Sequence, residues 1–421
     1  MPRLLADLTP LRVSADYRRL LIGNALANVG QQLAITALGL QVYDLTGSTL
    51  AVGLVGLFAL VPLVVLGLYG GAIVDAYDRR TVALGASAAL WVVSLATAGQ
   101  AWAGLEQVWV LYLLTSLHSA AFAVVQPARA AILPRLLPLR LLPAANALQA
   151  AVFPVGFTLG PVLAGVLVGQ LGYGVAYSVD VLTYLAALWA LVRLPSLPPQ
   201  GRVRRAGFSS VVEGLRYLRT QPNVRMTFVV DVLAMVSSFP RALFPAVAIA
   251  AFGAGPTTVG LLSGAMAVGS GLAGVLSGPL GRVNRQGLAV LWAITAWGTS
   301  IIGFGVVVLL AEVVGPGTWA LAAGLGFLVL AGASDAVSAV YRQTILQSAT
   351  PDAMRGRLQG VFVVVVAGGP RLGELATSGV AQAVGEGMAA VAGGVVCVLG
   401  IGWLARRNPR FRRYDARHPE P

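Results

Sequence analysis

The sequence predicts an all-α protein that is embedded in a membrane. Of its 421 residues, 57% are hydrophobic and only 11% are charged, whereas ordinary globular domains contain about 25% charged residues. The mean hydropathy is +0.80. Apolar runs recur along the whole chain, each close to the length of about 20 residues that a helix needs to cross a bilayer. A water-soluble fold could not cover its surface with so few charges, so we expect lipid around most of the chain.

The apolar runs predict twelve membrane-spanning helices in two groups of six. Helices are expected rather than strands, because the runs are longer than the alternating segments of about 10 residues found in membrane barrels. The first six predicted helices cover residues 20–43, 50–74, 82–103, 107–126, 142–169 and 174–193. The second six cover residues 224–251, 257–280, 286–311, 317–341, 358–383 and 387–405.

The positions of the arginines predict the orientation of these helices. All 29 basic residues are arginine, and they gather in every second connection between helices. The opposite connections carry Asp44, Glu106, Glu312 and Glu386 without any arginine. Connections that carry arginines are retained on the cytoplasmic side of a membrane. We therefore expect the chain in the cytoplasmic membrane, with both termini in the cytoplasm. This one-sided pattern explains the net charge of +13 without a nucleic-acid partner.

The long polar stretch between the two groups predicts the domain organisation. We expect a six-helix half at 1–193, a cytoplasmic linker at 194–223, a second half at 224–406 and a basic cytoplasmic tail at 407–421. Within the linker, residues 209–220 place apolar side chains at helical spacing, which predicts a short amphipathic helix on the membrane surface.

The two predicted halves have matching residues along the chain. A shift of 213 positions places Arg129 on Arg342 and brings three pairs of glycines together. These pairs are Gly156 with Gly369, Gly160 with Gly373, and Gly172 with Gly385. We therefore predict an internal duplication of a six-helix unit, as in transporters built from parallel repeats.

The stretch GGAIVDAYDRR, residues 70–80, lies between the second and third predicted helices. It resembles the signature loop of major facilitator transporters at Gly71, Asp75, Arg79 and Arg80, and departs from that pattern at Ala76 and Asp78. A second stretch, VGFTLGPVLAGVL, is similar to the antiporter motif of drug–proton exchangers at Gly156, Gly160, Pro161 and Gly165. A third pair of stretches, QPARAAILPRLLPLRLLPAANALQ and TPDAMRGRLQG, resembles the branch with the enterobactin exporter and macrolide-efflux-type proteins.

The resemblance implies a fold of two six-helix halves around a central cavity. It also implies a monomeric secondary transporter that exports a small molecule in exchange for protons and needs no cofactor. According to the resemblance, Asp75 holds the inner gate closed. The simpler alternative is that the arginines of the loop only keep it on the cytoplasmic side. The glycines and Pro161 let helices approach closely and bend, which suits either a moving interface or static packing.

Polar residues inside the predicted helices mark candidate sites, because charges at the bilayer centre cost about 2.5–3.5 kcal/mol. Asn24, Asn28 and Gln31 share one face of the first helix with Gln32 beside them, so we expect this face to line a cavity; interhelical hydrogen bonding is the alternative. Further candidates for the cavity are Arg241 and Arg371. Candidates for proton coupling are Glu374, ranked first, and then Asp231, Asp335 and His118. A histidine is included because its unperturbed pKa of about 6.5 lies near physiological pH.

Other functional classes find less support. Cys397 is the only cysteine, which excludes disulfides within the chain and argues against a cysteine-based metal site. No catalytic triad, metal cluster or phosphate loop is evident, so an enzyme is not expected. A transporter-fold sensor without flux and an importer of a nutrient remain the alternatives to an exporter. The sequence leaves open whether the substrate is a siderophore, a macrolide or another drug.

Overall fold

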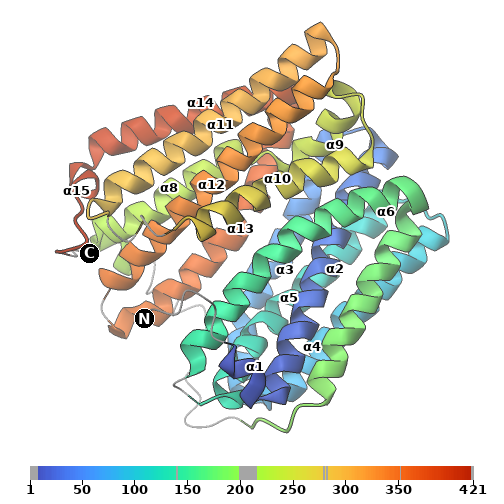
Figure 1. Cartoon of the computed structure of the whole chain (residues 1–421), viewed down its shortest axis with the longest axis vertical. Helices are drawn as coiled ribbons and strands as arrows, with labels where there is room; N and C mark the ends of the chain where they lie inside the picture. The colour runs from blue at the N-terminus through green and yellow to red at the C-terminus, as the bar shows by residue number, and fades with distance from the viewer. Residues whose placement is uncertain are drawn as a thin grey trace. The chain divides into compact units, whose positions relative to one another are not determined.

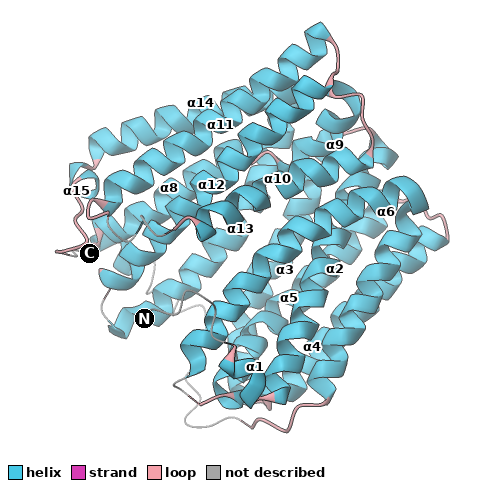
Figure 2. Ribbon diagram, viewed as in Figure 1, coloured by secondary structure: helices cyan, strands magenta, loops and turns pink. Residues whose placement is uncertain are grey.

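The computed structural model of the chain is helical throughout the residues it describes, and its connections are short (Figures 1 and 2). The described residues are 8–138, 141–198, 216–277, 280, 283–350 and 352–418. Within them, nine helices are long and apolar enough to cross a membrane. Helix α2 is not among these nine, because Asn24, Asn28, Gln31 and Gln32 interrupt its apolar run. The chain is therefore a multi-pass membrane protein, as predicted, while the count of twelve crossings stays a prediction.

The helices of the N-terminal part lie close to the predicted ranges, except that α5 continues ten residues beyond the predicted end at 126. Their bounds are α1 Thr9–Val13, α2 Ala15–Thr46, α3 Thr49–Ala76, α4 Arg79–Trp102, α5 Val108–Leu136 and α6 Leu142–Val192. Helix α6 contains two predicted helices, which are separated at Gly172 with φ 80° and ψ 175°. A positive φ is readily adopted only by glycine, so this residue lets the chain reverse direction without a longer loop.

The C-terminal part starts at α8 Pro222–Ser238. Three short elements follow: η2 Arg241–Leu243, α9 Phe244–Ala246 and η3 Val247–Ala251. The remaining helices are α10 Pro256–Val275, α11 Gln286–Val314, α12 Thr318–Ser348, α13 Asp352–Val384, α14 Glu386–Arg407 and α15 Pro409–Arg412. Helix α11 packs against α12 and α14, and α13 packs against α8 and α14.

The span predicted over about 224–251 is present at residues 222–251, but its helix is interrupted. Helix α8 ends at Ser238, and Phe239 has the extended conformation φ −78°, ψ 114°. Pro240 explains the break, because a proline disfavours helical geometry in the residue before it and has no N–H to donate. The chain then continues as a 3₁₀ turn and a π-helical turn, so Arg241 lies at an interruption of the helix rather than on a regular face.

The described contacts divide the chain into two compact units. Unit 1 comprises residues 1–45 and 58–207, and unit 2 comprises 46–57 and 208–421. The boundary thus falls once inside α3, whose first residues pack with unit 2. Most of the predicted linker, residues 199–215, lies outside the described residues, and residues 216–220 are helical. The predicted division into halves at 194–223 therefore stays a prediction.

The predicted basic tail is folded against unit 2. Phe411 and Tyr414 are buried, and the space beside Gly287 of α11 is filled by the Phe411 backbone and the Tyr414 side chain. The Ala416 N–H donates to the Asn284 carbonyl over 2.8 Å. Two apolar aromatic side chains thus hold this segment in place despite the arginines around them.

Candidate functional site

Unit 1 contains a polar cavity of about 250 Å³. The predicted polar face of α2 lies in its wall, with Asn24, Asn28, Gln31 and Gln32 all among the lining residues. The rest of the wall comes from α4, α5 and α6, through Leu90, Phe122, Gln126, Arg129, Gln149, Val152, Phe157 and Tyr184 among others. The spacing of the α2 residues explains this placement, because i, i+4 and i+7 lie on one side of a helix.

Several polar atoms in this wall are buried and have no hydrogen-bond partner among the described residues. They are Asn24 Oδ1, Gln32 Oε1 and Arg129 Nε, which gives two acceptors and one donor. A buried polar atom without a partner costs about 1–3 kcal/mol. These atoms are therefore available to a ligand that offers both donors and acceptors.

Among the described residues that line this cavity, Arg129 is the only charged one. Its terminal nitrogen donates to Ser87 Oγ of α4 over 3.2 Å, which fixes the guanidinium at the wall. Phe122, Phe157 and Tyr184 add aromatic surface. The cavity therefore suits a neutral or anionic molecule with aromatic rings better than a cation.

The sequence did not indicate Arg129, Gln126 or Tyr184 as site residues. In the sequence, Arg129 served as one of the arginines that set topology and as a match to Arg342 in the internal repeat. The signal was the spacing of Gln126 and Arg129, which are three residues apart and so share a helix face. His118, a predicted proton site, does not line the cavity but lies within hydrogen-bond distance, 3.2 Å, of the Tyr184 hydroxyl.

The antiporter-like glycines bring α6 against α2. A Cβ added at Gly160 would lie 2.6 Å from Gln32 Cβ and 2.8 Å from the Val29 carbonyl. One at Gly156 would overlap the Asn28 side chain. Pro161 and Gly165 follow on the same helix and are buried. The glycines of this motif thus let α6 pack closely against the face of α2 that lines the cavity.

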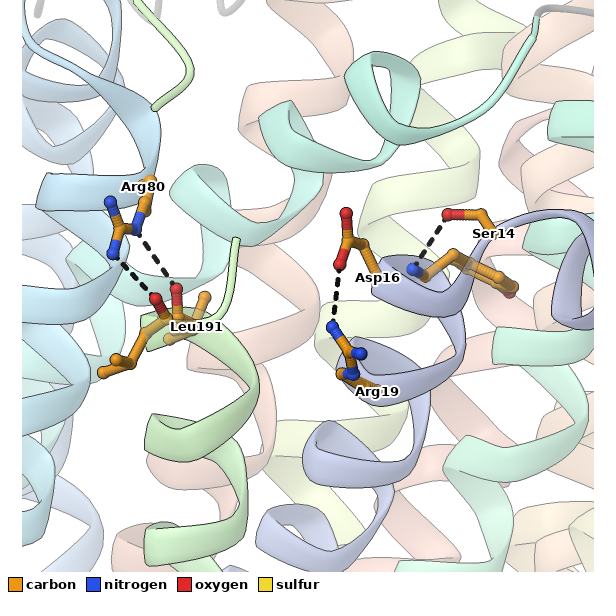
Figure 3. A network of polar contacts seen from close by, with 7 residues as sticks. Ser14, Asp16, Arg19, Arg80 and Leu191 are labelled. Carbon is orange, nitrogen blue, oxygen red and sulfur yellow. Dashed lines mark hydrogen bonds and ion pairs between the residues drawn. The ribbon is translucent and has the colours of Figure 1, made fainter. Parts of the chain in front are cut away.

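The loop after α3 is held by hydrogen bonds to the end of α6. The Arg80 guanidinium donates to the carbonyls of Leu191 and Val192 over 3.3 and 2.7 Å (Figure 3). Asp78 is the N-cap of α4, where it accepts from the Thr81 N–H over 2.9 Å, and also accepts from Ser196 and the Leu197 N–H. Burial opposes ionisation of Asp78, but these bonds outweigh it and lower its pKa. The side chain of Asp75, the predicted latch, lies outside what the structure describes, and so do the surroundings of Gly71.

The remaining predicted carboxylates belong to unit 2 and have cations beside them. Asp231 of α8 forms a buried ion pair with Arg342 of α12, and Asp335 lies 3.4 Å from the same guanidinium. Glu374 of α13 lies close enough to Arg241 and Arg371 for their charges to interact.

Glu374 also faces the part of α3 that belongs to unit 2. Its Oε2 is 2.8 Å from the position of a Cβ added at Gly56. Arg241 and Arg371 do not line the cavity described above, so the structure brings the predicted site residues together in two separate groups.

Comparison with known proteins agrees with this architecture. The family described as transmembrane secretion effector matches residues 5–421. The enterobactin exporter EntS of Citrobacter koseri is 27% identical over 96% of this chain and 96% of its own. The enterobactin exporter EntS of Shigella boydii serotype 18 is 26% identical over 88% of this chain and 86% of its own.

Solved transporters share the fold at low sequence identity. The nucleoside transporter NupG superposes with a TM-score of 0.69 at 14% identity and covers 94% of this chain and 98% of its own. A POT family transporter in complex with 5-aminolevulinic acid reaches 0.74 at 11% identity, covering 94% and 97%. With its match to the family over nearly its whole length and the helical architecture of these transporters, the chain belongs to the transmembrane secretion effector family and has the major facilitator fold.

Proposed function

We propose that this protein exports a polar, aromatic small molecule of the siderophore class across the cytoplasmic membrane, in exchange for protons. The observation that carries the proposal is the cavity of unit 1, whose wall combines aromatic faces, unpaired acceptors and the positive charge of Arg129. The relatives named as enterobactin exporters supply the substrate class. A cationic drug would meet the like charge of Arg129, so it fits the cavity less well.

Alternating access needs parts that move and parts that latch. Gly156, Gly160, Pro161 and Gly165 give α6 a close, bent contact with the substrate-binding face of α2, and this contact would slide or rock as the cavity opens. Gly71, Asp75, Arg79 and Arg80 would control the inner gate, with Asp75 as the latch. In this proposal the termini are cytoplasmic, and the protein acts as a monomer.

Transport into inside-out vesicles tests the proposal. Energised vesicles that contain the protein should accumulate enterobactin, and an uncoupler should abolish the accumulation. A panel of macrolides and cationic dyes in the same vesicles distinguishes a siderophore exporter from a general drug exporter. Absence of uptake for every compound, with normal amounts of protein, would favour a sensor without flux.

A matched pair of variants tests the cavity. Gln32→Leu removes one buried acceptor from the wall, and the loss of one hydrogen bond should raise the KM for enterobactin by up to about tenfold. Gln170→Leu makes the same exchange at an exposed position of α6 and should leave the KM unchanged. Equal KM values for both variants would place the binding site elsewhere.

A further inference from the structure

A line of polar side chains follows one face of the second part of α6. Tyr173, Tyr177, Asp180 and Tyr184 are spaced by four, three and four residues, which keeps them on one side of the helix. Tyr184, at one end of the line, lines the cavity. At the other end Tyr173 donates to Asp44, at the end of α2. The line therefore leads from the cavity of unit 1 to the end of its helices.

Asp180 in the middle of this line is the most unusual group. It is 3% exposed, and its Oδ2 accepts a hydrogen bond from Ser94 Oγ of α4 over 2.6 Å. Its Oδ1 is buried without a hydrogen-bond partner. Gly30 of α2 faces this oxygen, since a Cβ added there would lie 2.9 Å from it. Within the described residues no cation forms an ion pair with Asp180.

The groups around Asp180 are almost all neutral. From α6 the titratable groups are Tyr177 and Tyr184, both of which interact with it electrostatically. Helices α2 and α4 contribute Gly30 and Ser94. Beyond Tyr184 lie His118 and Arg129 of α5. An ionised carboxylate at this position has lost its contacts with water and has gained no cation. Burial of this kind favours the protonated, neutral form of the acid.

This environment separates Asp180 from the other carboxylates of the chain's interior. Asp231 forms an ion pair with Arg342, and Glu374 lies near Arg241 and Arg371, so each of these carboxylates has a nearby cation that Asp180 lacks. Only a group whose charged and neutral forms are both accessible can bind and release a proton during a transport cycle. Asp180 meets this requirement better than Glu374, which the sequence favoured.

Polar groups continue the path on the side of Asp180 away from the cavity. The Tyr177 hydroxyl donates to Gln41 Oε1 over 2.8 Å, and the amides of Gln41 and Gln100 donate to each other over 3.3 and 3.1 Å. These groups lie between Asp180 and the contact of Tyr173 with Asp44. These hydroxyls and amides make the stretch between Asp44 and Asp180 polar, although within the described residues no hydrogen bond joins Tyr177 or Gln41 to Asp180.

We propose that Asp180 is a proton-binding site of unit 1 and the group that carries the proton exchanged for substrate. The second part rests on the proposed function. The carboxylate takes up one proton from the side of Asp44, becomes a neutral acid, and releases that proton toward the cavity. The Ser94 hydroxyl holds the ionised form, so both states have a partner.

Infrared difference spectroscopy of the purified protein in nanodiscs tests the site without any substrate. Between acidic and alkaline pH, the wild type should show the carbonyl-stretch band of a buried carboxylic acid. Asp180→Asn should lose this band, whereas Asp16→Asn, which changes a half-exposed carboxylate of the same unit, should keep it. Ser94→Ala keeps the acid but removes its partner, so the band should move in frequency. A band that is the same in all three variants would overturn the proposal.

Proteoliposomes with a pH-sensitive dye inside test the role in exchange, with enterobactin as the probe. Wild-type protein should move protons when enterobactin is added, and Asp180→Asn should lower this flux to that of protein-free vesicles while still exchanging labelled for unlabelled enterobactin. Proton flux that survives Asp180→Asn and disappears in Glu374→Gln would overturn the assignment. A wild type that moves no protons would instead refute proton exchange as the function, while the infrared result would still decide whether Asp180 binds a proton.

Discussion

At the scale of single residues, the buried ion pair of Arg342 and Asp231 makes a prediction about the stability of unit 2. Both side chains are only 5% exposed, so removal of Asp231 leaves the buried Arg342 with only the longer contact of 3.4 Å to Asp335. Asp231→Ala should therefore lower the stability of the protein by about 3–5 kcal/mol, measured as a loss of thermal stability in detergent. The double change Asp231→Leu with Arg342→Met should be more stable than Asp231→Ala, since the one charge left behind is that of Asp335, whose side chain is 38% exposed. If the single and double variants melt together, the pair does not stabilise unit 2.

Asp78 makes a prediction that depends on pH. Loss of an N-cap costs about 0.5–2 kcal/mol, so Asp78→Ala should melt earlier than the wild type at neutral pH. Its pKa is lowered in the folded protein, so its contribution is present above the unfolded pKa of about 3.9 and is lost as pH falls through the folded value. The difference between wild type and variant should therefore shrink in acid. A difference that is constant from neutral to acidic pH would show that the charge of Asp78 is irrelevant.

At the scale of helices, the contact of α6 with α2 can be tested with one methyl group. A Cβ at Gly160 would lie 2.9 Å from the Leu33 backbone nitrogen as well as close to Gln32, so Gly160→Ala forces two helices apart. Overpacking of this kind costs about 1–3 kcal/mol, and we expect lower thermal stability and slower transport. Gly99 of α4 has nothing within 4 Å of its added Cβ, so Gly99→Ala should be neutral or slightly stabilising. Equal behaviour of the two variants would contradict the close contact.

The internal repeat is the prediction about helices that the structure supports best. Gly172 and Gly385 have nearly the same conformation, with φ 80° and 84°, and each joins the fifth and sixth predicted helices of its predicted half. Gly373 on α13 meets Met235 and Phe239 at the end of α8, as Gly160 on α6 meets α2. The sequence could reveal this because a glycine at positive φ, or at a close helix contact, is hard to replace. It did not reveal the break at Pro240, because prolines within membrane helices often bend the helix without ending it.

At the scale of the whole molecule, the arginine distribution predicts the orientation in the membrane. Reporter proteins fused after Arg205 and after Arg413 should both be active in the cytoplasm. The physical reason is that arginines in short connections are retained on the inner side. A reporter fused after Glu106, in a connection without arginine, provides the control and should be active outside. An external signal from either of the first two fusions would contradict the predicted topology.

Helices and their order could be predicted, because length and apolar character are properties of a local stretch. The cavity could be predicted in part, since the spacing of Asn24, Asn28 and Gln31 defines one face of one helix. The rest of the cavity wall could not be predicted, because Arg129 and Tyr184 belong to other helices. The same holds for charges: whether Asp180 or Asp231 has a cation beside it depends on contacts between segments far apart in the chain.

The pair of Asp231 and Arg342 also has a consequence for how the protein is made. Asp231 lies near the middle of α8, a helix of only 17 residues, and the chain grows at about 5–20 residues per second. Synthesis of the chain between Asp231 and Arg342 therefore takes on the order of several seconds, during which Asp231 has no partner. We expect α8 to complete its insertion only after α12 has emerged from the ribosome. Chains truncated before Arg342 lack Cys397, the sole cysteine, so a cysteine placed in α8 can be labelled uniquely. It should react with a water-soluble reagent in such truncated chains and become protected once the chain extends beyond α12.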